Sequence, residues 1–312
     1  MTKKVLITGG AGYLGSVLSE HLLTAGFHVT VCDTLLFSQA SLFHLCANPH
    51  FKFVFGDVRD ETLISSLMRD ADVIIPLAAI VGAPACDRDR WMTTSVNLDA
   101  IRLIIKLRSK DQLLIYPTTN SGYGTKSGSQ FCTEETPLEP ISLYGTTKVD
   151  AEKAILECGD TISLRLATVF GLSPRMRLDL LVNHFTYMAA TEGYIVIFEK
   201  DFKRNFIHIR DVADCFIHSI NNYEKMKGRP YNLGLDEANL SKEQLALEIK
   251  RFVPHFFIHF SELGTDPDKR NYIVSNQRLR EVGFSARRTL QEGIQELLKG
   301  YQLLKRSPMR NV

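Results

Sequence analysis

The segment Thr8-Gly9-Gly10-Ala11-Gly12-Tyr13-Leu14-Gly15 joins the first apolar run of the chain to a helical pattern. Gly9 permits a tight turn, Gly12 lets the backbone approach a pyrophosphate, and Gly15 lets the helix pack closely on the strand. The start of the helix presents free N–H groups and a positive dipole end to the phosphates. The segment therefore predicts a dinucleotide site at the first strand-to-helix junction.

Short β-rich runs alternate with helical patterns through the first half of the chain. The runs are apolar on both faces, as strands buried in a parallel sheet are. The predicted strands cover residues 5–8, 28–33, 51–55, 73–75, 113–116 and 161–166, and the predicted helices cover residues 13–25, 61–68, 93–109 and 142–158. This alternation requires right-handed crossovers, so it predicts an α/β fold with a doubly wound parallel sheet.

The pattern becomes less regular after about residue 171. Predicted helices cover residues 178–192, 211–222, 241–252 and 289–305, and short predicted strands cover residues 195–198 and 205–209. Ser241 and Gln244 have the spacing of a capping box, which supports the start of the third of these helices. We predict a dinucleotide-binding domain in residues 1–170 and a smaller, mainly substrate-binding lobe in residues 171–312, with the chain crossing between them. A ligand should lie between the lobes, beyond the carboxyl ends of the strands.

The composition excludes several classes of function. The 312 residues include 37 Lys and Arg against 35 Asp and Glu, a net charge of +2. A chain so close to neutral lacks the basic excess that nucleic acid or an anionic membrane surface requires. We see no signal peptide or membrane-spanning run. Six scattered cysteines without a C-x-x-C pair predict reduced thiols in a cytoplasmic protein and no metal site.

Two aspartates follow predicted strands on the dinucleotide side. Asp33 ends the second strand, where a carboxylate binds the adenosine ribose hydroxyls and repels a 2′-phosphate. This position favours NAD over NADP. Asp57 follows the third strand, where it either accepts a hydrogen bond from the adenine amine or is a plain loop acid, and the sequence leaves both open.

A tyrosine and a lysine lie one helical turn apart in Tyr144-Gly-Thr-Thr-Lys148, at the start of the helix after the fifth strand. Oxidation of a secondary alcohol needs a base for the hydroxyl proton, and an adjacent ammonium favours the phenolate. Thr119, just after the fifth strand, is placed to orient the same hydroxyl. Tyr223 and Tyr301 also precede a lysine by four residues, but we predict that they lie on solvated helix faces.

With these motifs in this order, the chain resembles the extended short-chain dehydrogenases/reductases of the nucleotide-sugar epimerase/dehydratase family over its whole length. The resemblance implies a Rossmann domain that binds NAD, a catalytic Thr119, Tyr144 and Lys148, a cap that binds a nucleoside-diphosphate sugar, and a homodimer or larger homo-oligomer built on the helices near residues 93–109 and 142–158. The implied cofactor-binding residues are Gly9, Gly12, Tyr13, Leu14, Gly15, Asp33, Asp57, Val58, Leu77, Ala78, Ala79, Tyr144 and Lys148.

The resemblance also implies a set of substrate-binding residues. They are Asn120, Ser121, Thr168, Arg175, Asn183, Arg204 and Arg270. Arg204 and Arg270 would hold the diphosphate, because a planar guanidinium matches phosphate oxygens; the alternative is that they are surface arginines in ion pairs. Asn120 and Ser121 occupy the positions of the acid pair of the dehydratases, so elimination of water is not expected.

The segments 117–124, 165–183 and 266–272 are most similar to the GDP-manno-heptose 4-dehydrogenases of bacterial capsule biosynthesis. This resemblance implies oxidation of GDP-D-glycero-α-D-manno-heptose at C4. Two alternatives remain open: a 4-epimerase that uses the same residues, and a protein that senses NAD without turning over a substrate.

Overall fold

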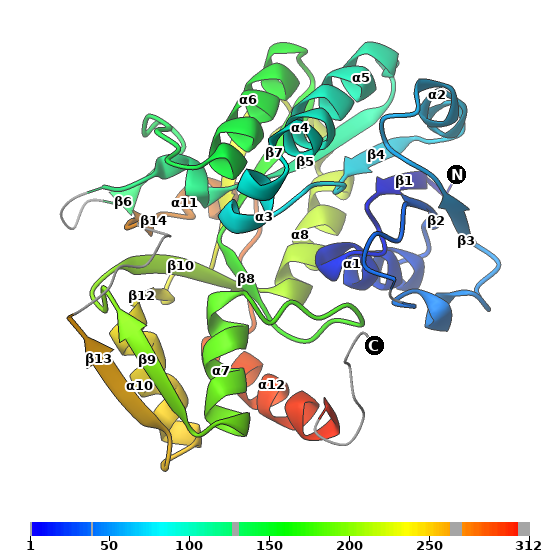
Figure 1. The fold of residues 1–312 in the computed structure, drawn as a ribbon. Helices are drawn as coiled ribbons and strands as arrows, with labels where there is room; N and C mark the ends of the chain where they lie inside the picture. The colour runs from blue at the N-terminus through cyan, green and yellow to red at the C-terminus, as the bar shows by residue number, and fades with distance from the viewer. Residues whose placement is uncertain (1, 39, 127–130, 263–269, 305–312) are drawn as a thin grey trace.

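A seven-stranded parallel sheet forms the centre of the larger lobe (Figure 1). The computed structural model describes residues 2–38, 40–126, 131–262 and 270–304. The strand order is β11-β7-β5-β4-β1-β2-β3. The strands are β1 (Lys4–Thr8), β2 (His28–Asp33), β3 (Phe51–Phe55), β4 (Val73–Pro76), β5 (Leu113–Thr119), β7 (Thr161–Leu166) and β11 (Arg229–Leu233). The predicted doubly wound parallel sheet is confirmed.

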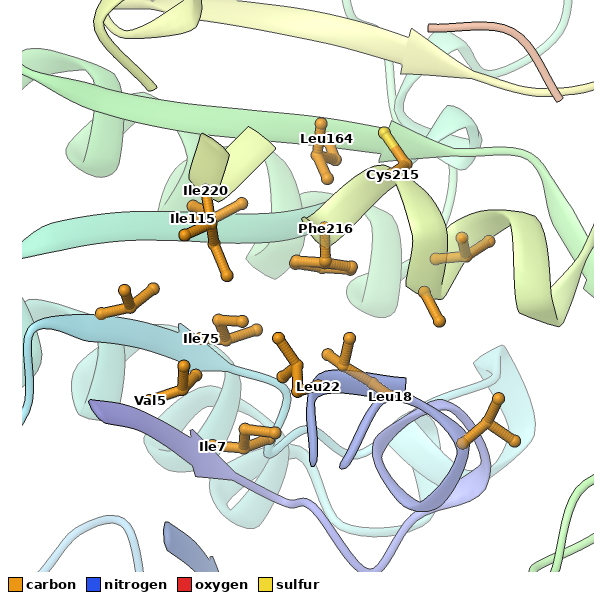
Figure 2. Packing of buried hydrophobic residues seen from close by; sticks show 14 of the residues in the cluster. Val5, Ile7, Leu18, Leu22, Ile75, Ile115, Leu164, Cys215, Phe216 and Ile220 are labelled. Atoms are coloured by element: carbon orange, nitrogen blue, oxygen red, sulfur yellow. The ribbon is translucent and has the colours of Figure 1, made fainter. Parts of the chain in front are cut away.

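Helices cover both faces of the sheet. On one face, α1 (Tyr13–Thr24) and α8 (Ile209–Asn221) pack Leu18, Leu22 and Phe216 against Ile7 and other strand residues, as Figure 2 shows. The other face is covered by α2 (Glu61–Arg69), α5 (Ala100–Leu107) and α6 (Leu143–Glu157). Each fully buried aliphatic or aromatic side chain in these layers stabilises the fold by roughly 1.5–3 kcal/mol.

The helix predicted over residues 93–109 is divided. It consists of α4 (Arg90–Thr94), a π-helical turn at Ser95–Asp99 and α5, and it is preceded by the short helix α3 (Ala83–Arg88).

A smaller lobe lies beside the carboxyl edge of the sheet (Figure 1). Its core is packed between α7 (Leu181–Thr191), α10 (Lys242–Phe252) and α12 (Leu290–Leu304). Ser241 and Gln244 form the predicted capping box at the start of α10. Its three-stranded sheet has β10 (Lys203–His208) between β8 (Thr168–Phe170) and β12 (Asn239–Ser241). Two further strand pairs join β9 (Tyr194–Phe198) to β13 (Phe257–Ser261) and β6 (Phe131–Cys132) to β14 (Ile273–Val274).

The chain returns to the large lobe after residue 171, so a single boundary does not separate the two lobes. Helix α8 and strand β11 both follow that position, yet they pack on or pair within the seven-stranded sheet. Strand β11 was not predicted, because its sequence, Arg-Pro-Tyr-Asn-Leu, contains a proline and polar residues that are untypical of a sheet interior. Strand β11 lies at the sheet edge, where proline is tolerated.

The prediction that Tyr223 and Tyr301 lie on solvated helix faces is wrong. The Tyr223 hydroxyl accepts a hydrogen bond from the Leu114 amide at 2.9 Å and donates to a backbone carbonyl at 2.5 Å. Tyr301 is fully buried and donates to the Asn183 carbonyl at 2.9 Å. Within the described ranges, no helix is long and apolar enough to cross a membrane.

Candidate functional site

A cavity of about 740 Å³ opens where the carboxyl ends of the sheet strands meet the smaller lobe. The loops after β1, β2, β3, β4 and β5 form one wall, and arginines of the smaller lobe form the opposite wall. The predicted residues that line it are Gly9, Gly12, Tyr13, Leu14, Gly15, Asp33, Asp57, Val58, Leu77, Ala78, Ala79, Thr119, Ser121, Tyr144, Lys148, Thr168, Arg175, Arg204 and Arg270. Residues that were predicted from separate motifs, as far apart in the chain as Gly9 and Arg270, therefore line one cavity.

The glycine loop has no room for side chains. Gly9 has a φ of +72°, and a Cβ there would lie 2.5 Å from the Ala78 amide nitrogen. A Cβ on Gly15 would lie 2.5 Å from the Cα of Gly10. Gly12 is the N-cap of α1 and supplies no side-chain cap, so the first N–H groups of the helix face the cavity. These features form a phosphate cradle that fits a dinucleotide.

Asp33 holds the glycine loop by accepting backbone hydrogen bonds. Its Oδ2 accepts a hydrogen bond from the Ala11 amide at 2.9 Å, and its Oδ1 accepts one from the Leu35 amide at 2.8 Å. Asp57 makes an ion pair with Arg59 at 2.6 Å, and this hydrogen bond lowers the pKa of the carboxyl group. Both aspartates line the cavity, but Asp57 is already paired with a cation.

The predicted catalytic residues come together at the end of β5 and the start of α6. Thr119 ends β5, and its hydroxyl donates to the Ser121 hydroxyl at 2.8 Å. The Ser142 hydroxyl accepts a hydrogen bond from the Gly145 amide at 3.1 Å, so α6 starts immediately before Tyr144. Lys148 follows one turn later. The three side chains therefore line the same part of the cavity.

Burial and nearby cations act on the Tyr144 phenol in opposite directions. Burial raises its pKa, while Arg177 and Arg270 of the smaller lobe lower it, as does the Thr119 hydroxyl. Burial dominates, so the pKa of Tyr144 lies above its usual value. Burial also lowers the pKa of Lys148 to about 7, against a smaller opposing effect from Glu152.

Asn120 and Ser121, which stand where the dehydratases are expected to carry an acid pair, have different surroundings. Ser121 faces the cavity and accepts a hydrogen bond from Arg270, which ties the smaller lobe to the catalytic loop. Asn120 is fully buried behind the loop, and neither of its amide atoms has a hydrogen-bond partner among the described residues. No carboxylate occupies either position.

Of two further predicted substrate residues, Asn183 lies outside the cavity wall and Arg175 lines the cavity. Asn183 is fully buried outside the cavity wall, where its amide group joins the Tyr13 hydroxyl at 3.1 Å to the Gly171 amide at 3.1 Å. Arg175 lines the cavity on the Asp33 side, with its guanidinium 4.0 Å from the centre of the Phe37 ring. Asn183 therefore connects the lobes, and Arg175 faces the cofactor end.

Other residues of the cavity were not among the predicted site residues. Arg177 pairs with Asp179, and its charge acts on the Tyr144 phenol. Lys242 and Tyr272 line the wall near Arg204. Arg177 lies in a segment that the resemblance did highlight, whereas Lys242 carries no sequence signal beyond the start of a helix.

Comparison with known proteins gives the family. Residues 5–234 match the NAD dependent epimerase/dehydratase family, so the chain belongs to that family and uses NAD. It is 27% identical over 308 residues to the low-salt glycan biosynthesis protein Agl12 of Haloferax volcanii, covering 95% of this chain and 98% of the relative. It is 27% identical over 307 residues to a UDP-glucose 4-epimerase of Lactobacillus helveticus, covering 89% and 90%.

The fold is also that of solved structures. A UDP-glucose-4-epimerase of Stenotrophomonas maltophila with bound NAD and formylated UDP-arabinopyranose superposes with a TM-score of 0.86. The two chains are 21% identical, and the match covers 98% of this chain and 99% of the other. In the described parts of the chain, no group of three or more His, Cys, Asp or Glu residues is arranged to hold a metal ion.

Proposed function

We propose that the protein is a dehydrogenase that oxidises the C4 hydroxyl of a nucleoside-diphosphate sugar, with GDP-D-glycero-α-D-manno-heptose as the substrate. The observation that carries this proposal is the meeting of Thr119, Tyr144 and Lys148 with the glycine loop in one cavity. Arg204 and Arg270 line the same cavity from the other lobe, at a place where guanidinium groups would hold a diphosphate.

Each residue has a distinct task in this reaction. Tyr144 takes the proton from the substrate hydroxyl, and Thr119 orients that hydroxyl. Arg177 and Arg270 favour the phenolate because they place positive charge near it. Lys148, one helical turn along α6, would do the same in its charged form. NAD⁺, when bound, supplies the hydride acceptor. A net oxidation then requires a second substrate, such as a small keto acid, to accept the hydride from the reduced cofactor.

The absence of acids beside Thr119 supports oxidation without elimination. Expulsion of water from the sugar needs a proton donor and a base next to the reacting carbons. Ser121 is instead bonded to Thr119 and Arg270, and Asn120 is buried away from the cavity. We therefore infer a 4-keto sugar that keeps its remaining hydroxyl groups.

A 4-epimerase is the second candidate, because relatives named as 4-epimerases match nearly the whole chain. It would use the same residues and return the hydride to the opposite face of the rotated sugar. Mixing the purified protein with GDP-heptose and following absorbance at 340 nm together with product mass separates the two. Loss of two hydrogens from the product supports the dehydrogenase, whereas an unchanged mass with inverted C4 refutes it.

The cellular setting and the assembly follow from the same proposal. The glycan biosynthesis role in the name of the Haloferax relative supports a place in surface polysaccharide synthesis. We propose a cytoplasmic homo-oligomer in which α5 and α6 pack against a second copy. A protein that only senses NAD is the remaining alternative, and it requires that no nucleotide sugar be converted at any concentration.

A further inference from the structure

Tyr116 lies directly beneath the Lys148 side chain. It belongs to β5, is fully buried, and presents its ring face to the Lys148 ammonium, with 4.0 Å between Nζ and the ring centre. Lys148 is only 5% exposed, and it also lines the cavity. The ammonium is therefore held between an aromatic face and the ligand space.

Among the described residues, no side chain or backbone group accepts a hydrogen bond from the Lys148 ammonium. Glu152, the carboxylate whose charge acts on Lys148, lies one turn further along α6. It is bonded to Arg165 at 2.6 and 2.9 Å and to Ser163 at 3.1 Å. The ring of Tyr116 is thus the group in contact with the positive charge. An aromatic face attracts a cation through its quadrupole, without an oxygen atom to accept a hydrogen bond.

The hydroxyl group of Tyr116 has no function of its own in this arrangement. It is buried and has no hydrogen-bond partner within the described structure. A buried hydroxyl without a partner destabilises a protein, so the hydroxyl does not explain why an aromatic residue is here. The ring face does explain it, because a ring gains attraction from a desolvated ammonium that an aliphatic side chain cannot supply.

We propose that Tyr116 is a positioning residue that holds the Lys148 ammonium toward the cavity through a cation–π contact. The contact leaves the N–H donors that point away from the ring available to ligands of the cavity, and it supports the charged form beside Tyr144. The consequence for catalysis rests on the proposed function, but the contact itself does not.

Several charged and titratable groups surround Lys148, and the test must separate the effect of the Tyr116 ring from theirs. Tyr144 and Glu152 lie on its own helix, and Tyr116 faces it from β5. Arg177 and Arg270 act on Tyr144 from across the cavity. Only a substitution at position 116 changes the ring without altering these groups.

The test is an NMR titration of the lysine ¹³Cε signals in the full-length protein, with Lys148 assigned from Lys148→Arg. Tyr116→Phe keeps the ring and removes the idle hydroxyl, whereas Tyr116→Leu removes the ring. Incorporating 3,5-difluorophenylalanine and pentafluorophenylalanine at position 116 keeps the ring shape and weakens its negative face step by step. This fluorinated series decides the question if the leucine variant does not fold.

We expect Tyr116→Phe to titrate like the wild type and to melt at an equal or higher temperature. In Tyr116→Leu, the ratio of charged to neutral Lys148 at a given pH should fall about tenfold. The two fluorinated residues should also lower this ratio, and pentafluorophenylalanine should lower it more than 3,5-difluorophenylalanine. An unchanged ratio across that series, or a loss in Tyr116→Phe equal to that in Tyr116→Leu, overturns the proposal. A failure of the proposed function appears separately, as a wild type that converts no nucleotide sugar.

Discussion

Lys148→Met should stabilise the cofactor-free protein at neutral pH while abolishing its activity. Burial lowers the pKa of Lys148 from 10.5 to about 7. Below pH 7 the native state therefore carries a buried ammonium that the unfolded chain would solvate, and the pKa difference corresponds to about 5 kcal/mol. Methionine is unbranched and apolar and removes this charge. For a chain of this length, about 5 kcal/mol corresponds to roughly 7 °C in Tm.

The sign of the pH dependence follows from the lowered pKa. Between about pH 7 and 10.5 the unfolded chain binds more protons than the native protein, so wild-type stability rises with pH over that window. The gain in the free energy of unfolding of Lys148→Met over the wild type should therefore shrink to about 2 kcal/mol at pH 9. Denaturant titrations at pH 6 and pH 9 measure it, and Lys153→Met, on the exposed side of the same helix, is the matched control. An equal gain in unfolding free energy at pH 6 and pH 9, or a Lys148→Met protein less stable than the wild type at pH 6, would refute the reasoning.

Three further substitutions test other parts of the site. Gly9→Ala places a Cβ 2.5 Å from the backbone of the loop after β4 and should weaken NAD binding at least tenfold by calorimetry, with the melting temperature as the check on folding. Glu152→Leu leaves the buried Arg165 charge without its partner and should lower the free energy of unfolding by about 3–5 kcal/mol in denaturant titrations; a loss under 1 kcal/mol would show that the pair is dispensable. Arg177→Leu should move the pH at which activity rises upward by about one unit, because the Tyr144 phenol loses a cation, and an unshifted profile would exclude that role.

The parts of the fold that could be predicted are those that depend on local pattern. Five of the six predicted strands of the large sheet are largely buried, as their apolar sequences indicate, whereas β3 is an edge strand with Phe53 and Phe55 exposed. The glycine loop could be predicted because its backbone approaches too closely for side chains at Gly9 and Gly15. Strand β11 was not predicted, because its buried Asn232 side chain is satisfied by hydrogen bonds with Tyr123 and Ser275, and its proline is tolerated through its place at the sheet edge. Such a place is a property of the tertiary structure.

The candidate site shows the same division. Tyr144 and Lys148 could be found because their contact is set by one helical turn. Arg177 and Tyr116 could not, because each meets this pair across a tertiary contact. Tyr301, in contrast, could have been placed from local pattern, because Ile294 and Leu297 precede it at helical spacing and share its buried face of α12.

In the proposed reaction, Tyr144 takes the proton of the C4 hydroxyl group, and NAD⁺, when bound, would take the hydride from the same C4 carbon. A single-turnover measurement of absorbance at 340 nm after mixing NAD-loaded protein with GDP-heptose tests it most directly. We predict a rise in the wild type and in Tyr194→Phe, whose tyrosine lies on the outer face of β9, and no rise in Tyr144→Phe. A rise of equal rate in Tyr144→Phe would contradict the account.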